Sequence, residues 1–163
     1  MSLLILELII LCLIFWGICF LNTGSDEKNI KSYVSYPNEI QKIIKENPDL
    51  QKKIKSVSPI VSFASNILVF GLVLFIFGLF LKKPSFKTNF INLMILGQAL
   101  NAFDFFVIDM LWWRNSKRIR FEGTKNRAEL YSNPKKHFIS FFKGILLFLI
   151  IALIDGLILS LIN

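Results

Sequence analysis

The chain has 163 residues, of which 54% are hydrophobic, and its mean hydropathy is +0.58. A soluble domain of this length does not carry its apolar residues in unbroken blocks, so the composition predicts an integral membrane protein. The net charge of +8 does not indicate nucleic-acid binding, because excess lysine and arginine in a membrane protein reflects topology and contact with anionic lipid headgroups. The expected partners are the lipid bilayer and those headgroups.

Four apolar runs are each long enough to cross the hydrocarbon core, which takes about 20 helical residues. Backbone groups in lipid must be satisfied within the segment, so we expect helices and not strands. The pattern predicts an all-α integral membrane four-helix bundle. It forms a single membrane domain over residues 1–163, with spans at about 3–21, 59–81, 90–113 and 138–162. The first run lacks a positively charged start and a cleavage site, which favours an uncleaved anchor.

The connectors between the spans differ in charge. Connectors 22–58 and 114–137 hold seven and eight basic residues, whereas the turn at 82–89 holds three. The two long connectors share one side of a four-span protein, and cytoplasmic loops are enriched in lysine and arginine. We therefore predict a multi-pass protein of the cell membrane with cytoplasmic long connectors and both termini outside. Trp112 and Trp113, which precede Arg114, are expected to anchor the third span at the cytoplasmic interface.

The first connector contains two expected helix starts, at Pro37 and Pro48, each followed by an acidic residue. Apolar residues at helical spacing follow both starts, which predicts two short amphipathic helices. Their apolar residues are Ile40, Ile43 and Ile44 in the first and Leu50, Ile54 and Val57 in the second. Such helices either lie on the inner leaflet or dock a partner. Alternatively, they fold as a cap against the protein's own cytoplasmic end.

Polar residues gather on one face of the third span. On a helical wheel, Gln98, Asn101, Asp104 and Asp109 fall within one arc, and charges inside a membrane helix tend to face the bundle interior or a water-filled cavity. This face could line a proton or ion path. It could equally hydrogen-bond to neighbouring helices and only hold the bundle together.

The first and fourth spans carry three more intramembrane charged residues. Lys143 is expected at the same leaflet as Asp109, so we predict that it pairs with Asp109 or Asp104, unless it extends to the headgroups. Glu7 and Asp155 approach the opposite leaflet. If the first and fourth spans touch, these two carboxylates could share a proton or bind a cation.

The third connector is the most basic segment. Its candidates for contact with a headgroup or a phosphate group are Arg114, Lys117, Arg118 and Arg120. Topology alone also explains this charge. His137 is the sole histidine, and without a second His or Cys nearby we predict no metal site. We find no catalytic or cofactor motif, so we expect no cofactor.

Three functions are compatible with these features. The first is a small accessory or assembly subunit without catalysis, which acts on another membrane protein or on itself. The second is an oligomeric transporter or channel that uses the polar face of the third span. The third is a membrane enzyme acting on a lipid-linked phosphate through Asp104, Asp109 and the basic connector.

Overall fold

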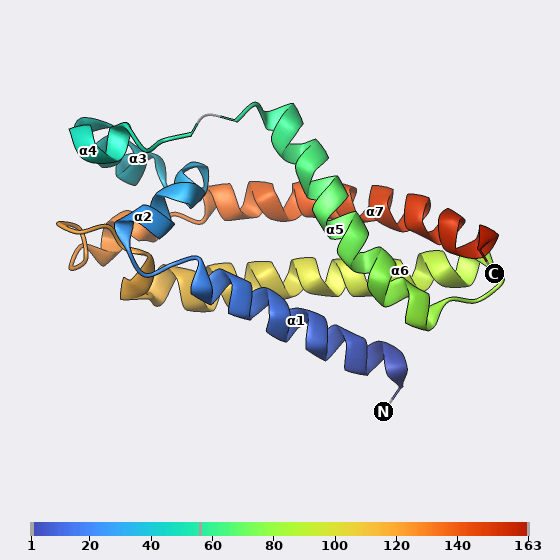
Figure 1. Cartoon of the computed structure of the whole chain (residues 1–163). Coiled ribbons are helices and arrows are strands. Elements are labelled where there is room, and N and C mark those ends of the chain that lie inside the picture. The colour runs from blue at the N-terminus through green and yellow to red at the C-terminus, as the bar shows by residue number, and fades with distance from the viewer. Residues whose placement is uncertain (1, 56, 163) are drawn as a thin grey trace. The chain divides into compact units, whose positions relative to one another are not determined.

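The computed structural model describes residues 2–55 and 57–162, and every regular element within them is a helix (Figure 1). Four helices are long and apolar enough to span a membrane. They are α1 (Leu3–Leu21), α5 (Pro59–Leu81), α6 (Phe86–Phe103) with its continuation η2 (Asp104–Trp113), and α7 (Lys135–Leu161). The predicted helical class and the four apolar helices are thereby confirmed.

Two of the predicted spans have the observed bounds, and two begin later than the observed helices do. α1 and α5 match, and Ser58 caps α5 by accepting a hydrogen bond from the Val61 amide. α6 begins at Phe86 and α7 at Lys135, whereas hydropathy predicts starts at about residues 90 and 138. Polar residues can occupy the first helical turn, so an apolar run underestimates the length of such a helix.

The third apolar helix changes its geometry at Asp104. From there to Trp113 the backbone forms the π-helix η2, where an unbroken α-helix was expected. A π-helix hydrogen-bonds residue i to residue i+5 and has a wider turn than an α-helix, so residues four and five positions apart share roughly one side. Asp104 and Asp109 therefore lie one turn apart on the same side of η2.

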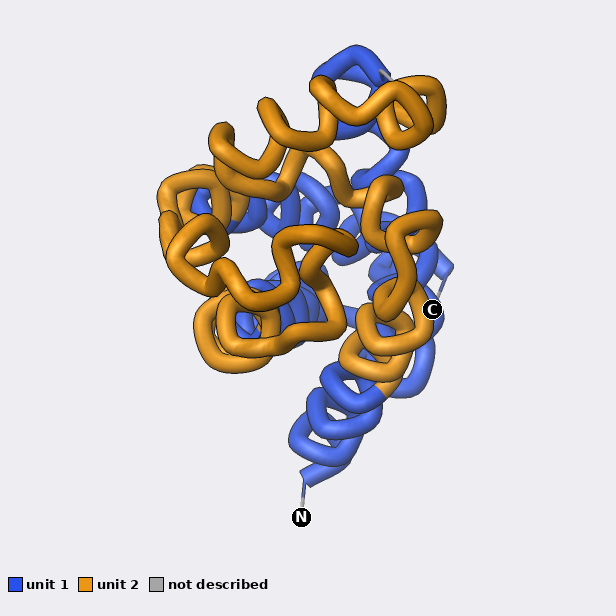
Figure 2. The backbone as a smooth tube through the Cα atoms, turned by 90° about the vertical axis from the view of Figure 1, so that its left-hand side faces the viewer, with its two compact units in different colours: residues 1–13, 57–103, 141–163 blue, residues 14–56, 104–140 orange. Residues whose placement is uncertain are grey.

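The chain divides into two compact units, shown in different colours in Figure 2. Unit 1 comprises residues 1–13, 57–103 and 141–163, and unit 2 comprises residues 14–56 and 104–140. The divisions fall inside α1 and α7 and at the junction of α6 with η2. The single membrane domain expected from hydropathy stays a prediction.

Within unit 1, glycines allow the helices to approach one another closely. α6 and α7 run antiparallel (Figure 1), with Gly156 against the backbone of Phe90 and Gly97 against Phe148. Gly78 of α5 lies against Leu93 and Leu159. Small residues at such crossings let backbones pack closely in membranes.

Unit 2 contains the short helices of the two long connectors. They are α2 (Asp26–Asn29), η1 (Ile30–Ser35), α3 (Asn38–Glu46), α4 (Pro48–Gln51), η3 (Lys117–Ile119) and η4 (Ala128–Tyr131). The apolar side of α3, through Ile40 and Ile44, is buried in a core with residues of the other connector and of η2. The buried members of this core are Ile30, Tyr36, Ile40, Ile44, Trp113, Ile119, Phe121 and Tyr131. The two connectors therefore fold together as one cap, and α3 does not present its apolar side to a lipid surface.

Two details of the expected connector structure are corrected. The second amphipathic helix ends at Gln51, so Ile54 packs on the core from outside the helix and Val57 is exposed. Trp113 is only 6% exposed, and its ring centroid lies 4.8 Å from that of Tyr36. Trp113 is thus a core residue of the cap and not an interfacial anchor, because its large ring completes an aromatic cluster.

Candidate functional site

The amides on the polar face of the third span join α6 to α7. Gln98 Nε2 donates to the carbonyl of Ile145 over 3.0 Å, and Asn101 Nδ2 donates to the carbonyl of Phe141 over 3.1 Å. Gly144 makes room for the Asn101 amide, since a Cβ at that position would overlap it. Of the two interpretations of these amides, the geometry favours interhelical hydrogen bonding.

Asp109 has a different partner from the one predicted. Its carboxylate Oδ2 lies 2.9 Å from Nδ1 of His137, and both side chains are largely buried. Trp113 packs edge-on against the imidazole, with 4.8 Å between the ring centroids. Lys143, the expected partner, is exposed. α7 begins at Lys135, so His137 lies in its first turn, and there it meets Asp109.

Glu7 and Asp155 are buried in unit 1 at 4% and 7% exposure. Neither Glu7 oxygen has a hydrogen-bond partner among the residues that the structure describes, and the same holds for Oδ2 of Asp155. Whether the two carboxyl groups share a proton or a cation, as the sequence suggests, stays a prediction. Each remains an intramembrane candidate.

In unit 2, Arg118 is held against the end of α1. Its Nε and Nη2 donate to the carbonyl of Phe20 over 3.3 and 3.1 Å, and Nε also lies 3.2 Å from the Thr23 hydroxyl. The guanidinium lies over the Phe20 ring, 4.0 Å from its centroid. Gly24, with φ of +110°, lets the chain turn here, and a Cβ on it would come within 2.7 Å of Arg118 Cζ.

Arg120 is the most deeply buried of the predicted basic candidates, at 7% exposure. Its Nη1 donates to the carbonyl of Lys125 over 2.7 Å, and its guanidinium lies 5.7 Å from the centroid of the Tyr131 ring. Its Nε is buried and has no hydrogen-bond partner among the described residues. A buried donor without a partner is costly, which makes Arg120 a candidate for ligand contact.

Most of the predicted basic candidates surround one open pocket of about 540 Å³ in unit 2. Its lining comprises Gly24, Ser25, Asp26, Lys117, Arg118, Arg120, Glu122 and Lys125. Arg114 lies instead beside a second pocket of about 360 Å³, which Arg120 also lines. Lys125, which stands in the same basic connector, was not among the residues predicted from the sequence.

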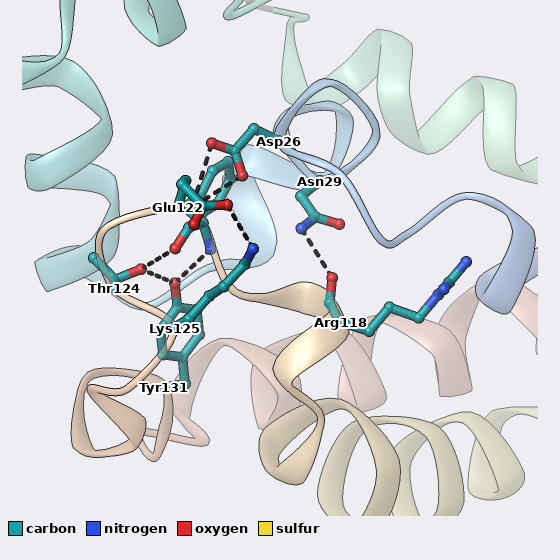
Figure 3. A network of polar contacts seen from close by, with 8 residues as sticks. Asp26, Asn29, Arg118, Glu122, Thr124, Lys125 and Tyr131 are labelled. Atoms are coloured by element: carbon teal, nitrogen blue, oxygen red, sulfur yellow. Dashed lines mark hydrogen bonds and ion pairs between the residues drawn. The ribbon is translucent and has the colours of Figure 1, made fainter.

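Hydrogen bonds between the two connectors fix the pocket wall (Figure 3). Asn29 Nδ2 donates to the carbonyl of Arg118 over 3.1 Å, and the amide of Glu122 donates to the Asp26 carboxylate over 3.1 Å. Lys125 pairs with Glu122, and this hydrogen bond raises the pKa of the Lys125 ammonium group. The pocket is thus lined by four basic and two acidic side chains.

A second part of the wall depends on tyrosines. Tyr131 accepts a hydrogen bond from the amide of Phe121 over 3.0 Å and shares another with the Thr124 hydroxyl. Tyr36 donates to the carbonyl of Ile119 over 2.7 Å, and burial raises the pKa of its phenol. Both hydroxyls therefore act as fixed hydrogen-bonding groups that hold residues 119–124 in place.

Comparison with known proteins found no matching protein family, no curated protein of similar sequence and no solved structure of similar fold.

Proposed function

We propose that the protein is a small integral membrane accessory or assembly protein that acts by contact and not by catalysis. The observation that carries the proposal is the use of Gln98 and Asn101 as donors to carbonyls of α7. These bonds occupy an N–H donor of each amide between the helices and not in a transport path. The hydrogen bonds of these amides between α6 and α7 support a structural role for the polar face of the third span.

Gentle extraction of the protein from its native membrane, followed by measurement of the mass and composition of the particle, tests this role. We expect a stoichiometric second membrane protein, because an accessory protein acts through a partner. A particle made only of this chain would contradict the proposal and favour the transport alternative. In that case Asp104→Asn and Asp109→Asn, on the same side of η2, would be expected to abolish flux without unfolding the protein.

The proposed arrangement is a four-helix bundle in the cell membrane, with both long connectors in the cytoplasm and both termini outside. Four apolar helices and the concentration of basic residues in connectors 22–58 and 114–137 support it. The cap formed by these connectors would then lie at the cytoplasmic surface.

Cysteine labelling tests this orientation. In a chain with Cys12 and Cys19 replaced by alanine, we expect Lys45→Cys to react with a membrane-impermeant maleimide only after the cells are permeabilised. Ser85→Cys, in the short turn between α5 and α6, should react in intact cells. Both residues are exposed, so the reversed labelling pattern would establish the opposite orientation.

A further inference from the structure

The pocket around Arg120 has an excess of positive charge that its own acidic residues do not cancel. Lys117, Arg118, Arg120 and Lys125 line it together with Asp26 and Glu122. Lys125 pairs with Glu122, and Asp26, which accepts from the neutral Glu122 amide, offsets one of the three other positive charges. The remaining positive charge is therefore available to an anion.

The side chain of Arg120 indicates that a phosphate group suits this pocket. The guanidinium group is a planar fork of donors that matches phosphate oxygens, and it remains charged at any physiological pH. Burial removes water from this group, while its Nε has no partner in the described part of the chain. Arg120 lines the pocket, and an anion bound there would offset part of the cost of burying its charge.

The place of the pocket in the chain indicates the source of the phosphate. Gly24 follows the end of α1 at Leu21, and Lys117 follows the end of η2 at Trp113. Three residues of chain reach at most about 11 Å, so Gly24 lies close to the end of its span. The headgroup layer occupies roughly 5–8 Å on each side of the hydrocarbon core. A lipid headgroup is therefore within reach of the pocket.

We propose that this pocket binds the phosphate group of an anionic lipid headgroup, with Arg120 and Lys117 as ligand contacts and Arg118 fixed beside them by Phe20 and Thr23. This inference depends on membrane insertion and not on the accessory role. An isolated homo-oligomer would contradict the accessory role and leave the lipid site unaffected.

Native mass spectrometry of the purified full chain, incubated with phosphatidylglycerol or with phosphatidylcholine of the same acyl chains, tests the proposal. We expect phosphatidylglycerol to be retained and phosphatidylcholine to be lost. Arg120→Gln should reduce retention about tenfold or more, the usual worth of a charged hydrogen bond. Lys117→Gln should reduce it about fivefold, the worth of one basic side chain near an anionic surface.

Lys45→Gln is the matched control, since it removes one exposed positive charge from the same unit but outside the pocket. Retention should be unchanged in this variant. Equal retention of the two lipids, or an equal loss in Lys45→Gln and Lys117→Gln, would overturn the proposal. If Arg120→Gln fails to fold, Lys117→Gln decides, and unchanged retention there rejects the site.

A competition experiment distinguishes a lipid headgroup from free inorganic phosphate as the ligand of the pocket. Millimolar inorganic phosphate should leave phosphatidylglycerol bound, because the lipid chains add apolar contacts that the free ion lacks. Displacement of the lipid by inorganic phosphate at equal concentration would show that the pocket takes a soluble anion, and the headgroup assignment would be wrong.

Discussion

Ile40→Ala is expected to destabilise the cap by about 2–5 kcal/mol, the usual effect of truncating a fully buried isoleucine. Ile40 is 1% exposed and belongs to the core that α3 shares with η2 and the third connector. Removing its side chain leaves a cavity among large residues that cannot close it fully. The measurement is limited proteolysis of the two long connectors across a temperature series.

Val34→Ala is the control, because Val34 lies in the same connector and is 70% exposed. The Val34→Ala variant should be cleaved at the same temperatures as the parent protein. The comparison also separates the two interpretations of α3. If the helix instead rested its apolar side on the lipid surface, Ile40→Ala would weaken membrane contact and leave the cleavage of residues 114–137 unchanged.

The second large effect is expected at Gly97, where α6 passes α7. An added Cβ would come within 2.7 Å of Phe148 Cδ1 and 2.9 Å of Phe148 Cβ. Phe148 Cβ is next to the backbone, so the helices themselves would have to separate. Gly97→Ala is therefore expected to destabilise the fold by about 1–3 kcal/mol, as overpacking of a close contact does.

Gly71→Ala provides the matched control, since nothing lies within 4 Å of a Cβ at that position of α5. Unfolding in mixed micelles with increasing denaturing detergent should show a lower midpoint for Gly97→Ala only. Equal midpoints for the two variants would contradict the close α6–α7 contact. Gly144→Ala should behave like Gly97→Ala, because the new carbon would overlap the Asn101 amide and disrupt its bond to Phe141.

The apolar helices could be located from the sequence because hydropathy is a sum over neighbouring residues. The bounds of α1 and α5 follow from apolar runs that end at polar residues, with Pro59 marking the start of α5. The concentration of basic residues in two connectors is equally a property of composition. The helix starts at Asn38 and Pro48 were also close to those expected, because proline and the acidic residues after it act locally.

The candidate site was predicted only in part. Lys117, Arg118 and Arg120 lie around one pocket, as a basic cluster in a short connector allows, whereas Arg114 lies beside another. The contribution of Gly24, Ser25 and Asp26 from the first connector could not be predicted. Nothing local in the sequence records that Asn29 hydrogen-bonds the backbone of Arg118.

By itself, the sequence determined the helical class, the four apolar helices and the basic connectors, since each depends on residues adjacent in the chain. Tertiary structure decided the partner of Asp109, the burial of Trp113 and the π-helix from Asp104. The first two depend on how segments far apart in the chain pack against one another. His137 and Lys143 lie six residues apart on α7, about 9 Å along its axis, and only the packing of the helices decides which of them meets Asp109. Hydropathy averaged over a segment is little changed by a shift of a few residues, whereas the partner of a particular side chain is changed completely.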